Sequence, residues 1–404
     1  MSYVASYFSR LFSLDLVGLI TTAFIVTGIV LLGTIAFDAI HFVLHKMMNS
    51  RSRLARSIGG LHGVHHAFYD RNLVIHPNLR RRNILLHHVP EVGTQFLVVS
   101  SFLLFTDWFY VVTAQLVCII NLTIVALQGG QDWNHKPTPF MPSPRRSLHV
   151  CPTYHALHHV HPNHYFSSIV TVFDRIVGTA MPVAGRTFLV TGASGAFGAP
   201  LCALLEARGG TVLRAKYGAD WSYDDVTGLI PQMQQADVLI LTHGSKRDFA
   251  QQANSDSFVA LIEQFLALKR GRQMVPEVWA VGSEIEAHPH FGNEELKIYS
   301  ASKRSYARFA HAYYLDERVL YRHIVPSAFT SPMGKGLISG KLAVDIAMFF
   351  IDRGFRYVPV TYTGIALINY FKFVFAGPMI GRRPTLPTTT LPAATLPSTA
   401  ASPS

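Results

Sequence analysis

A stretch without a single charge limits most strongly what this chain can form. It runs from Leu16 to Phe37, 22 residues in all. At about 1.5 Å per residue, a helix of this length covers the roughly 30 Å hydrocarbon core of a bilayer. The stretch is longer than the apolar part of a signal peptide, and no cleavage-like run of small residues follows it. We therefore expect a retained transmembrane helix.

A second apolar segment, from Val92 to Gly130, contains only one charged residue, Asp107. Trp108 and Tyr110 stand beside it, and such amphipathic rings favour a bilayer interface. The pattern predicts a helical hairpin that turns near Asp107. Its first limb is short for a full span, so a tilted or partly re-entrant arrangement is also open. One span and a hairpin would leave residues 38–91 and everything after Gln131 on the same face.

The balance of charges indicates a membrane protein and the side on which its loops lie. Charged residues make up 15% of the chain and hydrophobic residues 49%, against a usual charged share of about 25%. The formal net charge is +11, and much of it falls between the two apolar segments, at Lys46, Arg51, Arg53, Arg56, Arg71, Arg80, Arg81 and Arg82. By the positive-inside rule that loop is cytoplasmic. The basic residues form no stripe interleaved with aromatics, so nucleic acid is not expected as a partner.

Length and local composition predict three regions. A chain of 404 residues exceeds what one core usually serves. We expect a membrane-embedded helical domain over 1–180 and a soluble α/β domain over 184–380. Buried strands are predicted at Thr187–Val190, Val238–Leu241 and Val278–Val281. Residues 384–404 are mostly Pro, Thr, Ala, Leu and Ser, which predicts a disordered tail.

Cysteine usage excludes two kinds of site. The chain has three cysteines, Cys118, Cys151 and Cys202, and no CxxC pair. Neither a disulfide framework nor a thiolate metal site is indicated, and a reducing compartment fits.

Histidines gather in the first half of the chain. Of 20 in all, 15 lie between His41 and His164. They include an HxxxH pair at His41 and His45 and two HxxHH triplets, at His62, His65 and His66 and at His155, His158 and His159. On a helix, residues three and four apart share a face, so each cluster directs its imidazoles to one place. Neutral imidazole binds iron, zinc and copper, and the lack of thiolates argues against a structural zinc module. Two linked iron ions would use this many ligands, whereas lone histidines such as His149, His161 and His164 are more often ordinary polar residues.

Residues Asp38 to Thr179 resemble the fatty acid hydroxylase and sterol desaturase family of membrane di-iron enzymes. Asp38, followed by His45 and Lys46, is similar to the family's first histidine box. The two HxxHH triplets are similar to its second and last boxes. The residues Phe173, Asp174, Arg175, Gly178 and Thr179 resemble its WDxxFGT ending.

The chain departs from the family pattern in two boxes. In one alignment of the first box the second histidine falls at Asn49, which leaves His41 as the substitute. In the third box only His135 is evident, with Gln131 four residues before it. Whether His76, His87 or His88 completes the set is open. The resemblance implies two iron ions with the ligands His41, His45, His62, His65, His66, His135, His155, His158 and His159.

A glycine-rich run in the second half is typical of nucleotide binding. Residues Val190 to Gly198 follow a predicted strand and open a helix, and helix-start amides there bind pyrophosphate. The candidate cofactor residues are Thr191, Gly192, Ser194, Gly195 and Gly198. After the second strand, Arg214 and Lys216 stand where an acidic residue would select NAD, so NADP is favoured. Solvated surface charges would give the same pattern.

A Tyr-Ser-Ala-Ser-Lys run carries the candidate proton chemistry. Tyr299 and Lys303 stand four residues apart, which places phenol and ammonium on one helical face. A nearby cation stabilises phenolate and makes tyrosine a usable acid or base. Ser283, after the third predicted strand, is placed to hydrogen-bond a substrate oxygen.

Residues Gly185 to about Phe375 resemble the short-chain dehydrogenase/reductase family. Thr191, Gly192 and Gly198 are similar to its cofactor turn, and Ser283, Tyr299 and Lys303 to its catalytic set. Departures are Ala196 for a glycine, Leu241-Thr242-His243-Gly244 for Asn-Asn-Ala-Gly, and Ser327 for the glycine after Pro326. Asn254 is a weaker match to a structural asparagine of the family. The spacing between motifs is short, so we expect one α/β element to be missing.

Together the two resemblances imply a bifunctional, multi-pass membrane oxidoreductase. The iron pair would hydroxylate or desaturate a fatty acyl, sterol or isoprenoid lipid with dioxygen, and the second domain would interconvert alcohol and carbonyl. A short-chain dehydrogenase moves a hydride, so single electrons for iron would come from a ferredoxin or a cytochrome b5-like protein. Both sites are expected on the cytoplasmic face. Iron-dependent aldehyde chemistry on lipids and a non-catalytic, NADPH-sensing membrane scaffold are alternatives.

Overall fold

The computed structural model describes residues 3–135, 148–268, 275–287 and 292–376. The chain divides into two compact units, described separately below. The first extends to Val183 and also takes in Val275 and Met348–Phe355, and the second takes in the other described residues from Ala184 onward. The predicted tail at 384–404 lies outside the described residues.

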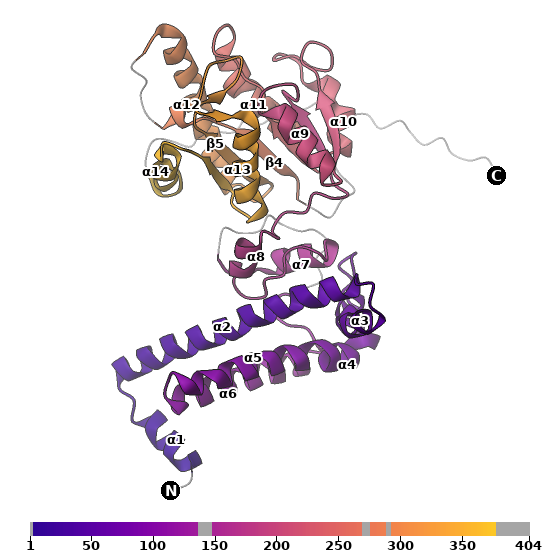
Figure 1. Cartoon of the computed structure of the whole chain (residues 1–404), viewed down its shortest axis with the longest axis vertical. Coiled ribbons are helices and arrows are strands. Elements are labelled where there is room, and N and C mark those ends of the chain that lie inside the picture. The colour runs from indigo at the N-terminus through magenta and orange to yellow at the C-terminus, as the bar shows by residue number, and fades with distance from the viewer. Residues whose placement is uncertain (1–2, 136–147, 269–274, 288–291, 377–404) are drawn as a thin grey trace, which may run out of the picture. The chain divides into compact units, whose positions relative to one another are not determined.

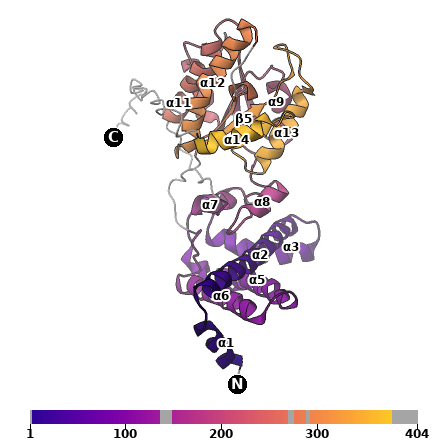
Figure 2. The ribbon, with the colours of Figure 1, turned by 90° about the vertical axis from the view of Figure 1, so that its left-hand side faces the viewer.

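The apolar helices of the first unit are α1 (Tyr3–Phe12), α2 (Leu16–Met48), α5 (Val89–Ser101), η3 (Phe102–Leu104) and α6 (Trp108–Leu127). Helices α2, α5 and α6 lie side by side, and α1 lies at one end of them (Figures 1 and 2). The predicted helix and helical hairpin are thus confirmed as secondary structure, although α2 continues well beyond Phe37. Helices α2 and α6 are long and apolar enough to cross a membrane.

The hairpin turns at Asp107, as predicted. The Asp107 carboxylate caps α6 by accepting a hydrogen bond from the backbone N–H of Phe109 at 2.9 Å. It also accepts one from the Arg10 guanidinium of α1 at 2.8 Å. The single charge of this apolar segment is therefore paired, and it lies at the start of α6.

Shorter helices complete the first unit, and two of them carry the histidine triplets. They are α3 (Arg53–Phe68), η1 (Pro77–Leu79), α4 (Arg80–Asn83), η2 (Ile84–His88), α7 (Pro152–Val160) and α8 (Val172–Val177). Ser52 caps α3, and Pro152 opens α7 at a position where its missing N–H costs nothing. Gly59 lets α3 approach α2 closely, because a Cβ there would lie 2.6 Å from the backbone nitrogen of Met48. This contact brings the first HxxHH triplet against His41 and His45.

The second unit is a Rossmann-like α/β domain built on a parallel sheet. Its six strands lie in the order β2-β1-β3-β4-β5-β8, and β6 pairs with β7 separately. The strands are β1 (Thr187–Thr191), β2 (Thr211–Ala215), β3 (Val238–Leu241), β4 (Glu277–Val281), β5 (Leu320–Pro326), β6 (Phe329–Thr330), β7 (Ile338–Ser339) and β8 (Tyr357–Val360). The three predicted strands are confirmed.

The helices of this unit are α9 (Gly198–Ala207), η4 (Thr227–Leu229), α10 (Ile230–Gln235), η5 (Gln252–Asp256), α11 (Ser257–Ala267), η6 (Glu284–Glu286), α12 (Glu294–Leu315), α13 (Gly340–Asp352), α14 (Ile365–Phe371) and η7 (Lys372–Ala376). Phe258 and Ile262 of α11 and Tyr306 and Tyr313 of α12 pack into the main core against β3 and β4. This packing places the amino-terminal half of α12 near the carboxyl ends of the strands.

One strand of the usual arrangement is missing from the described residues. The common doubly wound sheet has the order 3-2-1-4-5-6, with a strand outside the second one. Here β2 forms the edge, and the chain returns through α10 to β3 on the other side of β1. The predicted loss of one α/β element is confirmed.

Candidate metal centre and nucleotide-binding site

The nine predicted ligands lie in two groups in the first unit. A five-histidine group consists of His41, His45, His62, His66 and His158, and a four-histidine group of His65, His135, His155 and His159. Within each group the candidate ligand atoms all lie within 4.8 Å of one another. Helices α2, α3 and α7 and the segment after α6 supply them, so the three sequence clusters meet at one place.

Imidazole nitrogens face each other at short distances in both groups. The Nε2 atom of His135 lies 3.2 Å from that of His65 and 3.0 Å from that of His155. The Nε2 atom of His66 lies 3.1 Å from that of His45 and 3.2 Å from that of His158. Such crowding is possible only for neutral rings, because like charges this close repel strongly.

Burial keeps these rings neutral at physiological pH. Desolvation, together with neighbouring imidazoles, holds the pKa values of His62, His65, His66, His155 and His159 well below the usual range. Burial lowers the pKa of His158 to about 4. Each neutral ring offers one nitrogen lone pair, which is the form that binds a metal.

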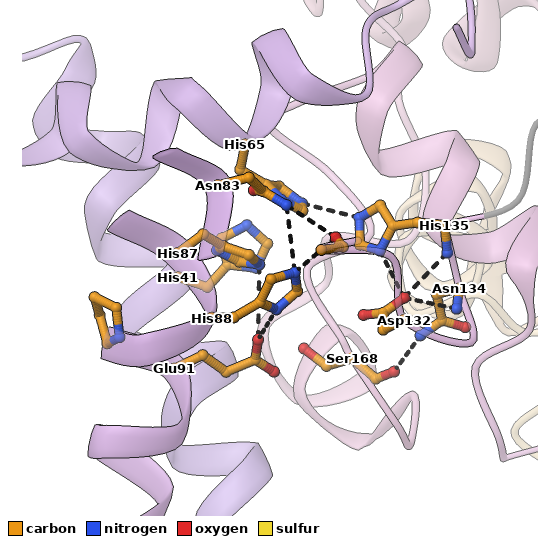
Figure 3. Close-up of polar contacts among 12 residues, drawn as sticks. His41, His65, Asn83, His87, His88, Glu91, Asp132, Asn134, His135 and Ser168 are labelled. Carbon is orange, nitrogen blue, oxygen red and sulfur yellow. Dashed lines mark hydrogen bonds and ion pairs between the residues drawn. The ribbon is translucent and has the colours of Figure 1, made fainter. Parts of the chain in front are cut away.

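Partners outside the groups orient the rings (Figure 3). The Nδ1 atom of His135 lies 2.6 Å from the Asp132 carboxylate, and that of His65 lies 3.1 Å from the Asn83 side-chain oxygen. Nδ1 of His158 lies 2.8 Å from the backbone carbonyl oxygen of His164. Nδ1 of His41 lies 3.3 Å from that of Phe166. A donor N–H at Nδ1 leaves the Nε2 lone pair directed into the group, an arrangement typical of metal-binding histidines.

The groups also contain buried nitrogens with no hydrogen-bond partner among the described residues. These are Nε2 of His41, both ring nitrogens of His62 and Nδ1 of His159. Each unsatisfied buried group costs about 1–3 kcal/mol. A cation in the five-histidine group would use the Nε2 lone pair of His41 and one nitrogen of His62. An all-imidazole set suits iron, zinc or copper. The residues therefore fit two metal ions.

Two aspartates from the motifs hold a loop against the five-histidine group. The buried Asp174 carboxylate accepts hydrogen bonds from the backbone N–H groups of Phe166 at 2.9 Å and Ser167 at 2.8 Å. Asp38 accepts from the N–H and hydroxyl of Ser168, at 3.0 and 2.6 Å. The Phe166 carbonyl is the partner of His41 Nδ1. Both aspartates thus act on the histidines through this loop.

A cavity of about 520 Å³ opens beside the histidines. His41, His135 and His155 form part of its wall. Helices α2, α5 and α6 supply both apolar and polar lining, for example Val30, Gln95 and Asn121. The space is large enough for part of a lipid molecule next to the candidate metal positions.

Sequence reasoning missed several residues of this region. Asp132 and Asn83, the partners of His135 and His65, carried no recognised motif, although the Asp132-to-His135 spacing of three was a usable signal. Glu91 was also missed, and it forms a third group of possible ligands with His87 and His88, which the sequence had left open as ligands. His76 instead pairs with Asp70 at 3.1 Å on an exposed loop and belongs to none of the three groups.

In the second unit, the glycine-rich turn has the close backbone approach that a pyrophosphate site requires. Gly192 has φ +68°, and a Cβ there would lie 2.6 Å from the backbone nitrogen of His243. A Cβ on Gly198 would lie 2.2 Å from the Gly192 carbonyl oxygen. Ser194 and Gly195 are exposed at this turn. Thr191 is buried, and its hydroxyl oxygen lies 2.7 Å from Nδ1 of His243. The turn thus fits a dinucleotide at the start of α9.

The two candidate selectors of NADP differ in their surroundings. Arg214 makes two hydrogen bonds to the Glu206 carboxylate, at 2.7 and 2.8 Å, and lies within β2. Lys216 directly follows Ala215, the last residue of β2 and the neighbour of Thr191 across the sheet. Lys216 therefore stands at the carboxyl end of the strand, where a ribose 2′-phosphate would lie, whereas Arg214 is already paired.

Ser283, Tyr299 and Lys303 come together around a cavity of about 380 Å³. Ser283 follows β4 and hydrogen-bonds the Tyr299 side chain. The Lys303 ammonium donates to the Val281 carbonyl at 3.0 Å and lies 5.9 Å from the Tyr299 ring centre. Burial raises the pKa of Tyr299 to about 12 and lowers that of Lys303 to about 8. This arrangement can give a proton to, or take one from, a substrate oxygen in the cavity.

Two glutamates near Ser283 were missed from the sequence. Glu286 completes a capping box with Ser283, and its Oε1 lies 2.7 Å from Nε2 of the buried His323. Glu284 is buried and accepts a hydrogen bond at 2.6 Å from Ser327, the residue that replaces the usual glycine after Pro326. Both carboxylates therefore fix the backbone that presents Ser283.

Comparison with known proteins found a relative that aligns with most of the chain. The monoglucosyldiacylglycerol epimerase of Synechocystis sp. is 26% identical over 396 residues, which cover 85% of this chain and 93% of that protein. The alignment therefore includes residues of both units. No family model matches the chain.

Solved structures are similar to about half of the chain. A short-chain dehydrogenase from Burkholderia cenocepacia, in complex with NADP, is 18% identical and covers 49% of this chain and 97% of its own, with a TM-score of 0.39. One from Sphingobium yanoikuyae, in complex with NADPH, is 16% identical and covers 50% and 97%, also with a TM-score of 0.39.

Proposed function

We propose that this chain is a membrane enzyme that oxidises and reduces one alcohol carbon of a lipid head group with a nicotinamide cofactor. Return of the hydride to the opposite face of the same carbon makes the net reaction an epimerisation. The observation that carries the proposal is the meeting of Ser283, Tyr299 and Lys303 beside the Gly192–Gly198 turn. The name of the Synechocystis relative, which specifies a glucosyl lipid and an epimerase, supports the substrate class.

Tyr299, Ser283 and Lys303 would each have a separate role in this reaction. The Gly192–Gly198 turn would hold NAD(P), which would supply the hydride acceptor and donor for the alcohol carbon. Tyr299 takes the hydroxyl proton during oxidation and gives a proton back to the oxygen during reduction. Ser283 hydrogen-bonds the same oxygen, and the Lys303 ammonium favours the phenolate that Tyr299 must pass through. The cycle is redox-neutral, so it needs no outside electron donor.

NADP is the proposed cofactor form, with Lys216 as the residue that contacts the 2′-phosphate. Because Arg214 is paired with Glu206, its replacement should matter less. Lys216→Ala should raise the KM for NADP, and Arg214→Ala should change it little. Equal increases in the KM for NADP in both variants would instead show that Arg214 also contacts the 2′-phosphate.

The function is tested with the purified full-length protein in detergent micelles. Monoglucosyldiacylglycerol and NADP⁺ or NAD⁺ are supplied, and the head-group sugar is identified after hydrolysis. We expect a second sugar epimer with the wild type and none with Tyr299→Phe. Epimer formation without any nicotinamide, or at an unchanged rate in Tyr299→Phe, would refute this chemistry.

The two histidine groups favour a second activity, oxygen-dependent hydroxylation or desaturation of a lipid. Nine imidazoles, eight of them buried, beside a cavity of about 520 Å³ support two iron ions there. Iron supplies dioxygen chemistry when bound, and the chain's residues hold the ligands, shield the site from water and orient the lipid. Single electrons would come from a ferredoxin or a cytochrome b5-like protein. Anaerobic assays separate the two activities, because the epimerisation needs no oxygen.

We further propose that α2 and the α5–α6 hairpin cross the bilayer. Reporters placed after Arg82 and after Arg186 should then show the same, cytoplasmic, sidedness. A reporter before Arg10 should show the opposite side. Opposite results for Arg82 and Arg186 would refute the single span and hairpin.

A further inference from the structure

A third ligand group lies outside the two histidine groups, on the turn that joins α4 to α5. It consists of His87, His88 and Glu91 (Figure 3). The Glu91 Oε2 atom lies 3.3 Å from Nδ1 of His88 and 3.7 Å from Nε2 of His87. Both histidines are buried, and the Glu91 side chain is only 14% exposed. Neither the family resemblance nor the proposed reactions use these three side chains together.

The local sequence explains why the three side chains converge. His87 and His88 precede Glu91 by four and three residues, so all three share one side of a helical segment. The chain forms one wide π-helical turn, η2, and the N–H of Val89 donates to the carbonyl of Ile84. Pro90 has no N–H to continue the normal pattern. Single π-helical turns of this kind often occur at functional sites.

The hydrogen bonds of His88 place a lone pair opposite a carboxylate. Its Nε2 lies 3.1 Å from the Gly130 carbonyl oxygen, which can only accept, so Nε2 carries the proton. The Asn83 amide, 3.3 Å away, gives its own hydrogen bond to the same carbonyl at 3.0 Å. In a neutral ring, Nδ1 is then an acceptor that faces Glu91. The 3.3 Å contact therefore holds either a second proton on the ring or a metal ion.

Two further features favour a metal ion over a proton. Nε2 of His87 faces the Glu91 carboxylate at 3.7 Å, which is too long for a hydrogen bond. The separations of 3.3 and 3.7 Å are close to the edge of a tetrahedral zinc site, roughly 3.3–3.6 Å for bonds of about 2.0–2.2 Å. Gln95 lies 3.5 Å from the other Glu91 oxygen and orients it. A proton shared by His88 and Glu91 would leave Nε2 of His87 outside this contact.

We propose that His87, His88 and Glu91 bind a third divalent metal ion, separate from the two histidine groups. Two imidazoles and one carboxylate form a set that zinc and non-haem iron both use. His87 and Glu91 also line the cavity of about 520 Å³. The fourth coordination position therefore opens towards that cavity, and the site is suited to bind water or a substrate oxygen.

The test counts metal ions per chain in the full-length protein purified in detergent. The protein is stripped with a chelator, reloaded with Zn²⁺, desalted and analysed by mass spectrometry of the metal. We expect three ions per chain in the wild type and two in Glu91→Gln, which removes the charge and keeps the shape. His76→Ala is the matched control, because His76 lies on the preceding exposed loop, and it should retain three.

Cobalt reloading gives a second readout. The third equivalent of Co²⁺ should add visible absorption bands that Glu91→Gln and His88→Gln both lack. Two ions per wild-type chain, or three in Glu91→Gln, would overturn the proposal and leave His88 as a protonated partner of Glu91. If the two histidine groups bound nothing, the wild type would hold one ion, and its loss in Glu91→Gln would still support this site. If Glu91→Gln fails to fold, the ion count of His88→Gln tests the site in the same way.

Discussion

The two units satisfy their buried polar groups in opposite ways. In the second unit the buried Glu277 carboxylate receives hydrogen bonds from Arg186 at 2.8 Å, Arg322 at 2.7 Å and the Trp279 indole at 2.8 Å. In the first unit, nine imidazoles face mainly one another, and several nitrogens have no partner in the described part of the chain.

This difference indicates which unit depends on a ligand. Buried charges are expensive unless they are paired, and the pairing around Glu277 comes from the protein itself. The histidine groups lack such partners, so a bound cation would supply them, and its binding energy would add to the stability of that unit. We therefore expect metal removal to destabilise the first unit and to leave the second largely unchanged.

The largest effect should follow removal of a ligand from the five-histidine group. His158→Ala should lose at least one bound metal ion per chain and abolish oxygen-dependent turnover, while nicotinamide binding is retained. Metal analysis measures the bound ions per chain, and a nucleotide-binding titration measures nicotinamide binding. His164→Ala is the control, because His158 is held by the backbone carbonyl of residue 164, which the substitution keeps. Unchanged metal content in His158→Ala would contradict the assignment.

A large effect confined to the second unit should follow loss of the proton donor. Tyr299→Phe keeps the ring and should lower nicotinamide-dependent turnover by roughly 10²–10⁴-fold. Metal content should stay at the wild-type level, because Tyr299 lies in the second unit. If metal content fell as well, the two units would not be independent as described here.

A moderate effect is expected from the partner of one ligand. Asp132→Asn weakens the hydrogen bond to Nδ1 of His135 and should reduce metal affinity about 10–100-fold. Although burial opposes it, the imidazole of His135 holds the pKa of Asp132 well below its usual range, so the carboxylate is ionised. Competition with a chelator measures the affinity. Asp70→Asn, which affects only the exposed His76, should leave it unchanged.

The smallest effect concerns the pH dependence of the second site. Burial is the main reason why the pKa of Tyr299 is raised, and the charge of Glu286 raises it further. Burial lowers the pKa of Lys303, and Glu286 opposes this. Glu286→Gln should therefore lower both pKa values. The rising limb of the oxidation rate should then move to lower pH by about one pH unit or less. The exposed Glu295→Gln is the control, and a shift to higher pH would contradict this electrostatic account.

Local patterns in the sequence predicted much of this molecule. The absence of charge from Leu16 to Phe37, the helical spacing of the histidine triplets and the strand before Gly192 each depend on neighbouring residues alone. The four-residue spacing of Tyr299 and Lys303 likewise required only a helix. Even the missing α/β element was visible as a short interval between motifs.

Tertiary structure decided which distant residues became partners. Asp132 lies beside His135 in the sequence, but Asn83 reaches His65, and the Phe166 carbonyl reaches His41, only after α3 and α7 have packed against α2. Arg214 was predicted to select NADP, yet packing of α9 beside β2 pairs it with Glu206. The physical reason is the same in each case. Spacing along the chain determines the face on which a side chain lies, whereas its burial and its hydrogen-bond partners depend on which other segments pack against that face.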